Sequence, residues 1–191
     1  MKEDLRIKKT KYVIKDTFIK LINEVGYQNI TVKNLCEKAL INRNTFYLHY
    51  CDKDDLVKTL MNESLERLKN NLQGLSFMGT ILITDYDKFQ AEVKKIVQII
   101  SEDIELYRAL LIDEYLSGYF KIIEYTFENY VIKQLKLNSK KDIITIKYII
   151  YGIIGILRDW IVNNTASVDE TALVLSKLIY TNIEQFIEQS N

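Results

Sequence analysis

No proline occurs among the 191 residues, and the six glycines are widely spaced. Because proline and glycine are the strongest breakers of regular secondary structure, we expect long, uninterrupted elements. Apolar residues recur every three to four positions along almost the whole chain, which is the period of one face of an α-helix. Alternation with a period of two, which marks a half-buried strand, is hard to find. The sequence therefore predicts an all-α protein.

The N-terminal part carries start and stop signals for four helices. The first is predicted to end at Gly26, a residue that readily takes the left-handed conformation after a helix. Thr31 is a good N-cap for a short helix through about residue 39. A third helix is predicted over about 43–50, and Asp52 can cap a fourth.

Five further helical patterns follow a break at about residues 74–86. They cover about 87–102, 104–113, 115–137, 142–163 and 169–188. Ser167 or Asp169 is expected to cap the last of them. We therefore divide the chain into a compact helical head, a connecting helix and a helical bundle. Their predicted bounds are 1–51, 52–75 and 76–191.

The net charge of zero hides an uneven distribution. Residues 1–50 carry ten Lys and Arg against five Asp and Glu, whereas residues 76–191 carry twelve against sixteen. A basic unit attached to an acidic body is typical of a protein whose small domain meets a polyanion. Chance segregation would produce the same totals, so charge alone does not decide between the two.

Residues 42–50, NRNTFYLHY, combine aromatic rings with amide and cationic groups and contain no acid. The helices on either side of the short turn at residues 40–42 form a helix-turn-helix pattern, whose second helix can enter a DNA major groove. Phe46 is expected to point back into the small core of the head. The side chains expected to contact DNA are Thr31, Lys33, Arg43, Asn44, Thr45, Tyr47, Leu48, His49 and Lys53.

These residue types suit different parts of a duplex. Arg43 and Asn44 can bond base edges with two hydrogen bonds each, and Leu48 can touch a thymine methyl group. Tyr47 and His49 can donate hydrogen bonds to phosphates, which position a helix without reading sequence. For His49 the alternative is a histidine satisfied within the small core.

Residues 26–57, GYQNITVKNLCEKALINRNTFYLHYCDKDDLV, resemble the DNA-binding signature of the TetR family of bacterial transcription regulators. The family pattern T-[FL]-Y-x-H-[FY]-x-x-K-x-x-L is matched at every position, by Thr45, Phe46, Tyr47, His49, Tyr50, Lys53 and Leu56. The resemblance implies a three-helix DNA-binding head, a homodimer, and a C-terminal bundle that dimerises and usually binds an effector. Leu40 replaces the usual turn glycine, so the turn must avoid positive φ or bear roughly 1 kcal/mol of strain.

Residues 151–164, YGIIGILRDWIVNN, show a weaker resemblance to the penultimate helix of a TetR subgroup that includes co-activator-dependent activators. Two glycines on nearly one face let another helix approach closely, and in the family that helix belongs to the second subunit. A core helix within one subunit is the alternative. The predicted dimer interface comprises Tyr148, Tyr151, Gly152, Gly155, Leu175, Ile179 and Ile183.

The bundle is also rich in aromatic residues, most of which are expected to be core. A ligand pocket, if one forms, is predicted from Tyr107, Leu111, Tyr115, Tyr119, Ile123, Arg158 and Trp160. Its tyrosines and the net acidity of this part of the chain favour an aromatic or cationic ligand.

Two regulatory mechanisms remain open. In the favoured one, a homodimeric repressor binds a near-palindromic operator and loses affinity when an effector binds its bundle. In the alternative, an activator or pocketless regulator is controlled by a protein partner that docks on the bundle. An enzyme is disfavoured, because the chain shows no nucleophile elbow, phosphate-binding loop or ligand cluster.

We expect action in the cytoplasm, at the bacterial nucleoid, with no membrane partner, cofactor or metal. No signal peptide is visible, and the most apolar run, residues 148–157, is far shorter than the ~20 residues that span a bilayer. Cys36 and Cys51 form no disulfide framework, and inert thiols are favoured over a redox switch. With His49, their spacing matches no standard zinc site.

Overall fold

The computed structural model describes residues 2–72, 85–135 and 139–190, and every regular element in these ranges is helical. The all-α prediction is therefore confirmed. The elements are α1 (Lys2–Val25), the 3-10 turn η1 (Tyr27–Asn29), α2 (Val32–Lys38), α3 (Arg43–Tyr47), α4 (Lys53–Leu72), α6 (Tyr86–Glu102), α7 (Ile104–Ile112), α8 (Ser117–Gln134), α9 (Lys140–Asn163) and α10 (Val168–Ser190). Most of the predicted break at 74–86 lies outside the described residues. Within them, no helix is long and apolar enough to cross a membrane.

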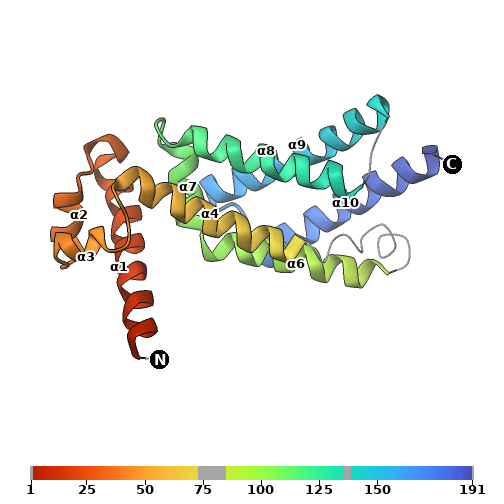
Figure 1. Cartoon of the computed structure of the whole chain (residues 1–191). Coiled ribbons are helices and arrows are strands. Elements are labelled where there is room, and N and C mark those ends of the chain that lie inside the picture. The colour runs from red at the N-terminus through yellow and green to blue at the C-terminus, as the bar shows by residue number, and fades with distance from the viewer. Residues whose placement is uncertain (1, 73–84, 136–138, 191) are drawn as a thin grey trace.

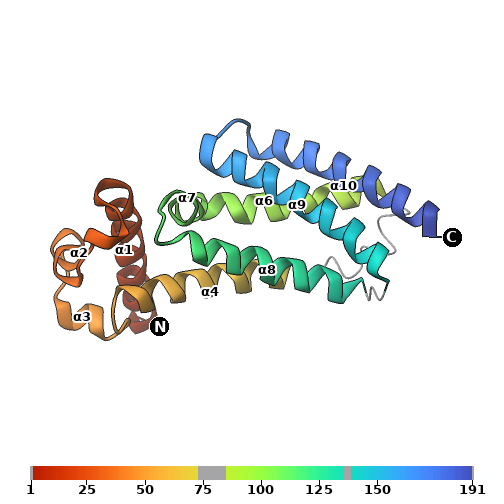
Figure 2. The ribbon, with the colours of Figure 1, turned by 90° about the horizontal axis from the view of Figure 1, so that it is seen from above.

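The helices form a small head at one end of an elongated bundle (Figure 1). Helices α1, α2 and α3 make the head, and α4 runs from it along the bundle. Within the bundle, α6 packs on α4 and α10, while α9 packs on α7, α8 and α10. The short helix α7 also contacts α1, so it lies where the head meets the bundle (Figure 2).

Local capping signals place two of the helix starts. The Thr31 hydroxyl accepts a hydrogen bond from the Asn34 N–H (3.1 Å), and the Asn34 side chain accepts one from the Thr31 N–H (2.9 Å). Helix α10 begins with the same reciprocal arrangement between Ser167 and Glu170. Ser167 is therefore the cap of α10, and the alternative choice of Asp169 is wrong.

The head is held together by an aromatic and aliphatic core. Phe18 of α1, Leu35 of α2 and Phe46 of α3 are fully buried, and Ile41 of the turn packs against the same cluster. This confirms that Phe46 points inward. Helix α3 ends at Tyr47, earlier than the predicted 43–50, and the Tyr50 ring packs on Phe46 with 5.6 Å between ring centroids.

Of the two alternatives for the turn between α2 and α3, the structure has the strained one, with positive φ at Leu40. Leu40 has φ of 53°, in the left-handed region, and its side chain is 92% exposed. Because so little of the side chain is buried, packing in this chain does not compensate for the clash between Cβ and the backbone.

Leu40→Gly should therefore raise the free energy of unfolding by roughly 0.5–1 kcal/mol. Relief of left-handed strain should outweigh the extra freedom that glycine has in the unfolded chain. Urea unfolding monitored by circular dichroism measures the change, with Leu40→Ala as the control because alanine keeps the Cβ. Equal stabilities for the two variants would show that Leu40 carries no strain.

Candidate functional site

The outer face of α3 carries polar and aromatic side chains and no acid. Arg43, Asn44, Tyr47 and Leu48 are exposed, Tyr47 by 55% and Leu48 by 80%, while Phe46 anchors the opposite face. Without carboxylates, this face can approach a polyanion without like-charge repulsion. Exposed side chains on the second helix of a helix-turn-helix are the ones that can enter a DNA groove.

The other residues predicted to bind DNA differ in how exposed their side chains are. Lys33 of α2 is exposed, whereas Thr45 and His49 are half-buried. The His49 ring lies beside the buried Tyr50, with 6.2 Å between centroids. Thr31 is exposed, but its hydroxyl is occupied by the cap of α2. Helices α2 and α3 are in contact, so these side chains border one surface.

Lys53 departs from its predicted role. Its ammonium group donates to the backbone carbonyls of Tyr27 (2.9 Å), Gln28 (3.2 Å) and Ile30 (2.9 Å), and lies 4.4 Å from the centroid of the Tyr27 ring. An ammonium has three N–H donors, so none remains for a phosphate in this arrangement. Lys53 instead ties the start of α4 to the segment between α1 and α2, and its assignment to DNA contact is corrected accordingly.

Tyr27 strengthens the same junction. Its hydroxyl donates to the carboxylate of Asp54 in the first turn of α4. Burial is the main cause that raises the pKa of the Tyr27 hydroxyl, and the bond to Asp54 adds to it. The residue therefore remains a protonated donor. The signature lysine and the aromatic residue after Gly26 thus act together to orient α4 on the head.

The predicted dimer residues divide into two groups. On α9, Tyr148 is 74% exposed, Tyr151 is 55% exposed, and a Cβ added at Gly152 or Gly155 would meet nothing within 4 Å. On α10, by contrast, Leu175 is 2% exposed and belongs to the core. The α9 residues face outward as expected.

The α10 residues of the predicted interface lie differently: Leu175 is buried, and Ile179 and Ile183 are half-buried. Leu175, Ile179 and Ile183 line an internal cavity instead. The outward apolar residues of α10 are Leu173, Val174 and Leu178, which are 43–50% exposed. Apolar residues occupy two sides of this helix, so the sequence period did not show which side faces the chain's own core.

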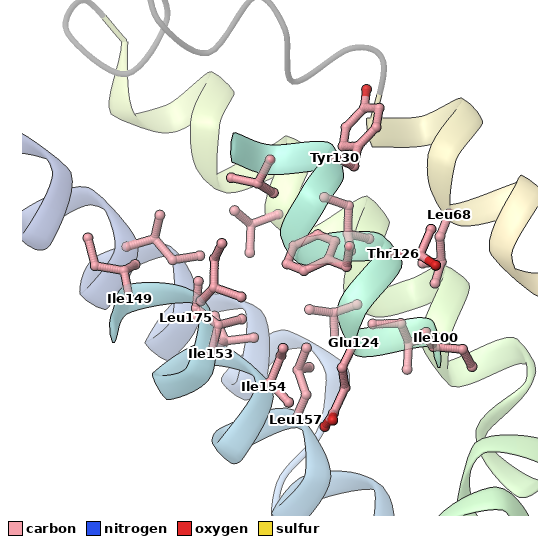
Figure 3. Close-up of a pocket in the computed structure, with 18 of the residues that line it drawn as sticks. Leu68, Ile100, Glu124, Thr126, Tyr130, Ile149, Ile153, Ile154, Leu157 and Leu175 are labelled. Atoms are coloured by element: carbon pink, nitrogen blue, oxygen red, sulfur yellow. The ribbon is translucent and has the colours of Figure 1, made fainter. Parts of the chain in front are cut away.

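A cavity of about 200 Å³ lies inside the bundle, between α4, α6, α7, α8, α9 and α10. Figure 3 shows side chains such as Leu68, Ile153 and Leu175 surrounding it from three different helices. Most of the lining consists of Leu, Ile, Val and Phe side chains. A cavity with such a lining favours apolar molecules.

Of the predicted pocket residues, Tyr107 and Ile123 line the cavity. The other five lie elsewhere. Leu111 and Tyr119 pack against the core, and Tyr115 is half exposed. Trp160 is buried with its indole N–H bonded to the Ala166 carbonyl, and Arg158 pairs with Glu124. Most of the residues predicted from aromatic and charged types therefore do not form the pocket. The mostly aliphatic walls do not favour a cationic ligand, whereas an apolar ligand, aromatic or aliphatic, suits them.

Most polar groups at this cavity are engaged, but the buried hydroxyl of Tyr130 on its wall has no hydrogen-bond partner among the described residues. Glu124 accepts a hydrogen bond from Arg158 (3.0 Å), and Lys69 donates to Glu66 (2.8 Å). Tyr107 shares a hydrogen bond with Ser64 (2.6 Å), and burial raises the pKa of its hydroxyl. The cavity thus offers mostly apolar contact together with the hydroxyl of Tyr130, which is unpaired within the described part of the chain.

The remaining titratable side chains do not assemble into a metal centre in the described ranges. No group of three His, Cys, Asp or Glu side chains there could hold a metal ion. Cys36 is buried, which raises the pKa of its thiol, while Cys51 is exposed.

Comparison with known proteins gives a consistent result. Residues 15–60 match a family model described as bacterial regulatory proteins, tetR family. An uncharacterized HTH-type transcriptional regulator, YxbF of Bacillus subtilis (strain 168), is 24% identical over 155 residues. That alignment covers 81% of this chain and 40% of YxbF, so the chain spans less than half of this relative's length.

Solved structures share the fold. A putative TetR-family transcriptional regulator from Syntrophomonas wolfei superposes with a TM-score of 0.68 at 16% identity, over 92% of this chain and 96% of that one. The fatty acid degradation regulator FadR from Bacillus halodurans superposes with a TM-score of 0.65 at 15% identity, over 90% and 94%. At these identities the likeness concerns the arrangement of helices.

Proposed function

This chain belongs to the TetR family of bacterial regulatory proteins, and from that premise we propose that it binds an operator as a homodimer under the control of an apolar small molecule. It is a helix-turn-helix transcriptional regulator by family. The acid-free outer face of α3, fixed from beneath by Phe46, is the observation that carries the proposal. The site of action would be the bacterial nucleoid.

Binding would place α3 in the major groove. Arg43 and Asn44 near its N-terminus would meet base edges, and Leu48 would meet an apolar base group. Lys33, Tyr47 and His49 would bind phosphates, so that affinity falls steeply with salt. Two heads about 34–36 Å apart would read a near-palindromic site.

Arg43→Ala tests base reading. A duplex selected by the wild-type protein from a random pool would be compared by fluorescence anisotropy with single-base variants of itself. Loss of a bidentate contact should reduce discrimination at one position by roughly tenfold or more. Lys121→Ala, an exposed cation on α8, should leave discrimination unchanged. Wild-type protein that binds all duplexes equally would overturn the proposal of sequence-specific binding.

Dimerisation would use the outward faces of α9 and α10. These faces carry the exposed apolar residues of α10 and, on α9, Tyr148, Tyr151, Gly152 and Gly155. A row of unfilled glycine positions allows a partner helix to pack closely, and the exposed apolar side chains would be removed from water. A symmetric pair of such faces closes a twofold dimer.

Gly155→Leu should convert the dimer to a monomer in light scattering. The new side chain has open space within one chain, so the fold itself should tolerate it, but it would hold the partner helix away. Gly118→Leu is the matched control, because this glycine of α8 also has open space around it and lies outside the proposed interface. If both variants remain dimeric, the interface lies elsewhere.

The cavity supports control by a small molecule rather than by a docked protein alone. Its effector must bind more tightly to the conformation in which the two heads are misaligned, since only differential affinity shifts an equilibrium. We propose a repressor that is released by an apolar effector. The second possibility is an activator controlled by a protein partner. It rests on the weaker resemblance of α9 to the subgroup that includes co-activator-dependent activators.

A series of straight-chain 1-alkanols probes the cavity. Dissociation constants measured by calorimetry should fall about fourfold per added CH₂ until the space is filled, because each buried CH₂ contributes about 0.8 kcal/mol. Val97→Phe should weaken binding of the longer alkanols by filling the cavity. Val25→Phe, at an exposed position in the head, should have no effect. Affinity that does not depend on chain length would argue against an apolar effector site.

A further inference from the structure

A buried carboxylate lies where the head, α4 and the bundle meet. Asp103, between α6 and α7, has a side chain only 3% exposed. Its carboxylate pairs with Lys15 of α1 and with Arg67 of α4, and accepts a hydrogen bond from Ser64 of α4 (3.1 Å). Two helices, α1 and α4, are therefore tied to one acidic group at the junction of α6 and α7.

The same network reaches the cavity. The Ser64 hydroxyl also shares a hydrogen bond of 2.6 Å with the hydroxyl of Tyr107, which lines the cavity from α7. Leu65, the residue after Ser64, lines it from α4. A continuous path therefore runs from the cavity wall through Ser64 and Asp103 to Lys15 in the head.

Helix α7 also holds the head at its other end. Asp113, the residue that follows α7, accepts a hydrogen bond from the backbone N–H of Tyr27 (2.8 Å). The acidic residues that flank this nine-residue helix thus both bond to the head, Asp103 to α1 and Asp113 to η1. Movement of α7 would move both attachment points together.

We infer that α7 and the Lys15–Asp103–Ser64–Tyr107 network transmit occupancy of the cavity to the DNA-binding head, with Ser64 and Asp103 as positioning residues. The inference rests on the proposed effector site. A molecule in the cavity displaces the Tyr107 ring, and α7 carries its two flanking carboxylates with it. Lys15 and Tyr27 follow, and the head turns relative to the bundle.

When α7 moves, the ion pairs of Asp103 are expected to move with it rather than to separate. An unpaired charge in a buried position is costly, so Asp103 and its cations stay together when α7 shifts. Burial, followed by the nearby Arg67 cation, lowers the pKa of Lys15, so these surroundings disfavour its ammonium form and the pairing with the Asp103 carboxylate opposes that effect. We therefore expect the head to move with α7 as a unit.

A double-variant cycle in the ligand-free protein tests the connection. Ser64→Ala and Lys15→Met remove members that the network joins through Asp103, and urea unfolding gives the unfolding constant of each variant. If the two sites were independent, the factors by which the single variants increase the unfolding constant would multiply in the double variant. We expect the double variant to increase the unfolding constant by a factor at least three times smaller than that product. Lys20→Met, at an exposed lysine of α1 paired with Asp16, should combine with Ser64→Ala as a simple product. A simple product for Lys15→Met would overturn the network.

A second measurement follows the response to 1-decanol as the probe. The ratio of DNA dissociation constants with and without decanol should be fivefold or more in the wild type. In Ser64→Ala it should fall below twofold, while calorimetry shows decanol binding within twofold of the wild type, since Ser64 does not line the cavity. Ser176→Ala is the matched control, because Ser176 is another buried serine beside a tyrosine hydroxyl and should keep the full response.

The two proposals fail in different ways. If decanol neither binds nor changes DNA affinity in the wild type, the effector site is overturned, and the unfolding cycle still decides whether the network joins Ser64 to the head. If the wild type responds and Ser64→Ala responds equally, the effector site stands and transmission through this network is overturned.

Discussion

The carboxylate of Asp103 holds the head and the bundle in one relative orientation. It is almost wholly buried and is paired with Lys15 of α1 and Arg67 of α4. A buried charge of this kind tolerates little displacement from its partners, because the low-dielectric interior makes separation expensive. The direction in which α3 points therefore depends on a contact made where the head meets the bundle.

The other features are arranged around that junction. On the head side, Lys53 and Tyr27 bind the first turn of α4 to the segment after α1, so α4 is anchored at its beginning. On the bundle side, α4 and α7 contribute to the cavity wall. The outward face of α9, with its uncovered glycines, would set how two bundles pair and hence how far apart two heads lie. Under the proposed function, a small change at α7 would alter the spacing on which recognition of a near-palindrome would depend.

Most of the fold could be predicted because its signals are local. The caps at Thr31 and Ser167, the stop at Gly26 and the inward direction of Phe46 all follow from residues within a few positions of one another. The α3 residues predicted to contact DNA could be placed on the outer face for the same reason, since one buried aromatic residue on a short helix determines that face.

The site in the bundle could not be predicted in the same way. Apolar side chains of α10 occupy two faces, and nothing local distinguishes the side that holds Leu175 in the core from the side that exposes Val174. Lys53 matched a family motif, yet its ammonium is used by three carbonyls about 25 positions earlier in the chain.

The sequence by itself determined the helices, the helix-turn-helix and the acid-free surface, because propensity, capping and periodicity act over a few residues. Only the tertiary structure decided which apolar faces enclose the cavity and that Lys15 would meet Asp103, 88 positions away. Such contacts depend on how whole helices pack, and helix packing brings together residues whose separation along the chain carries no periodic signal.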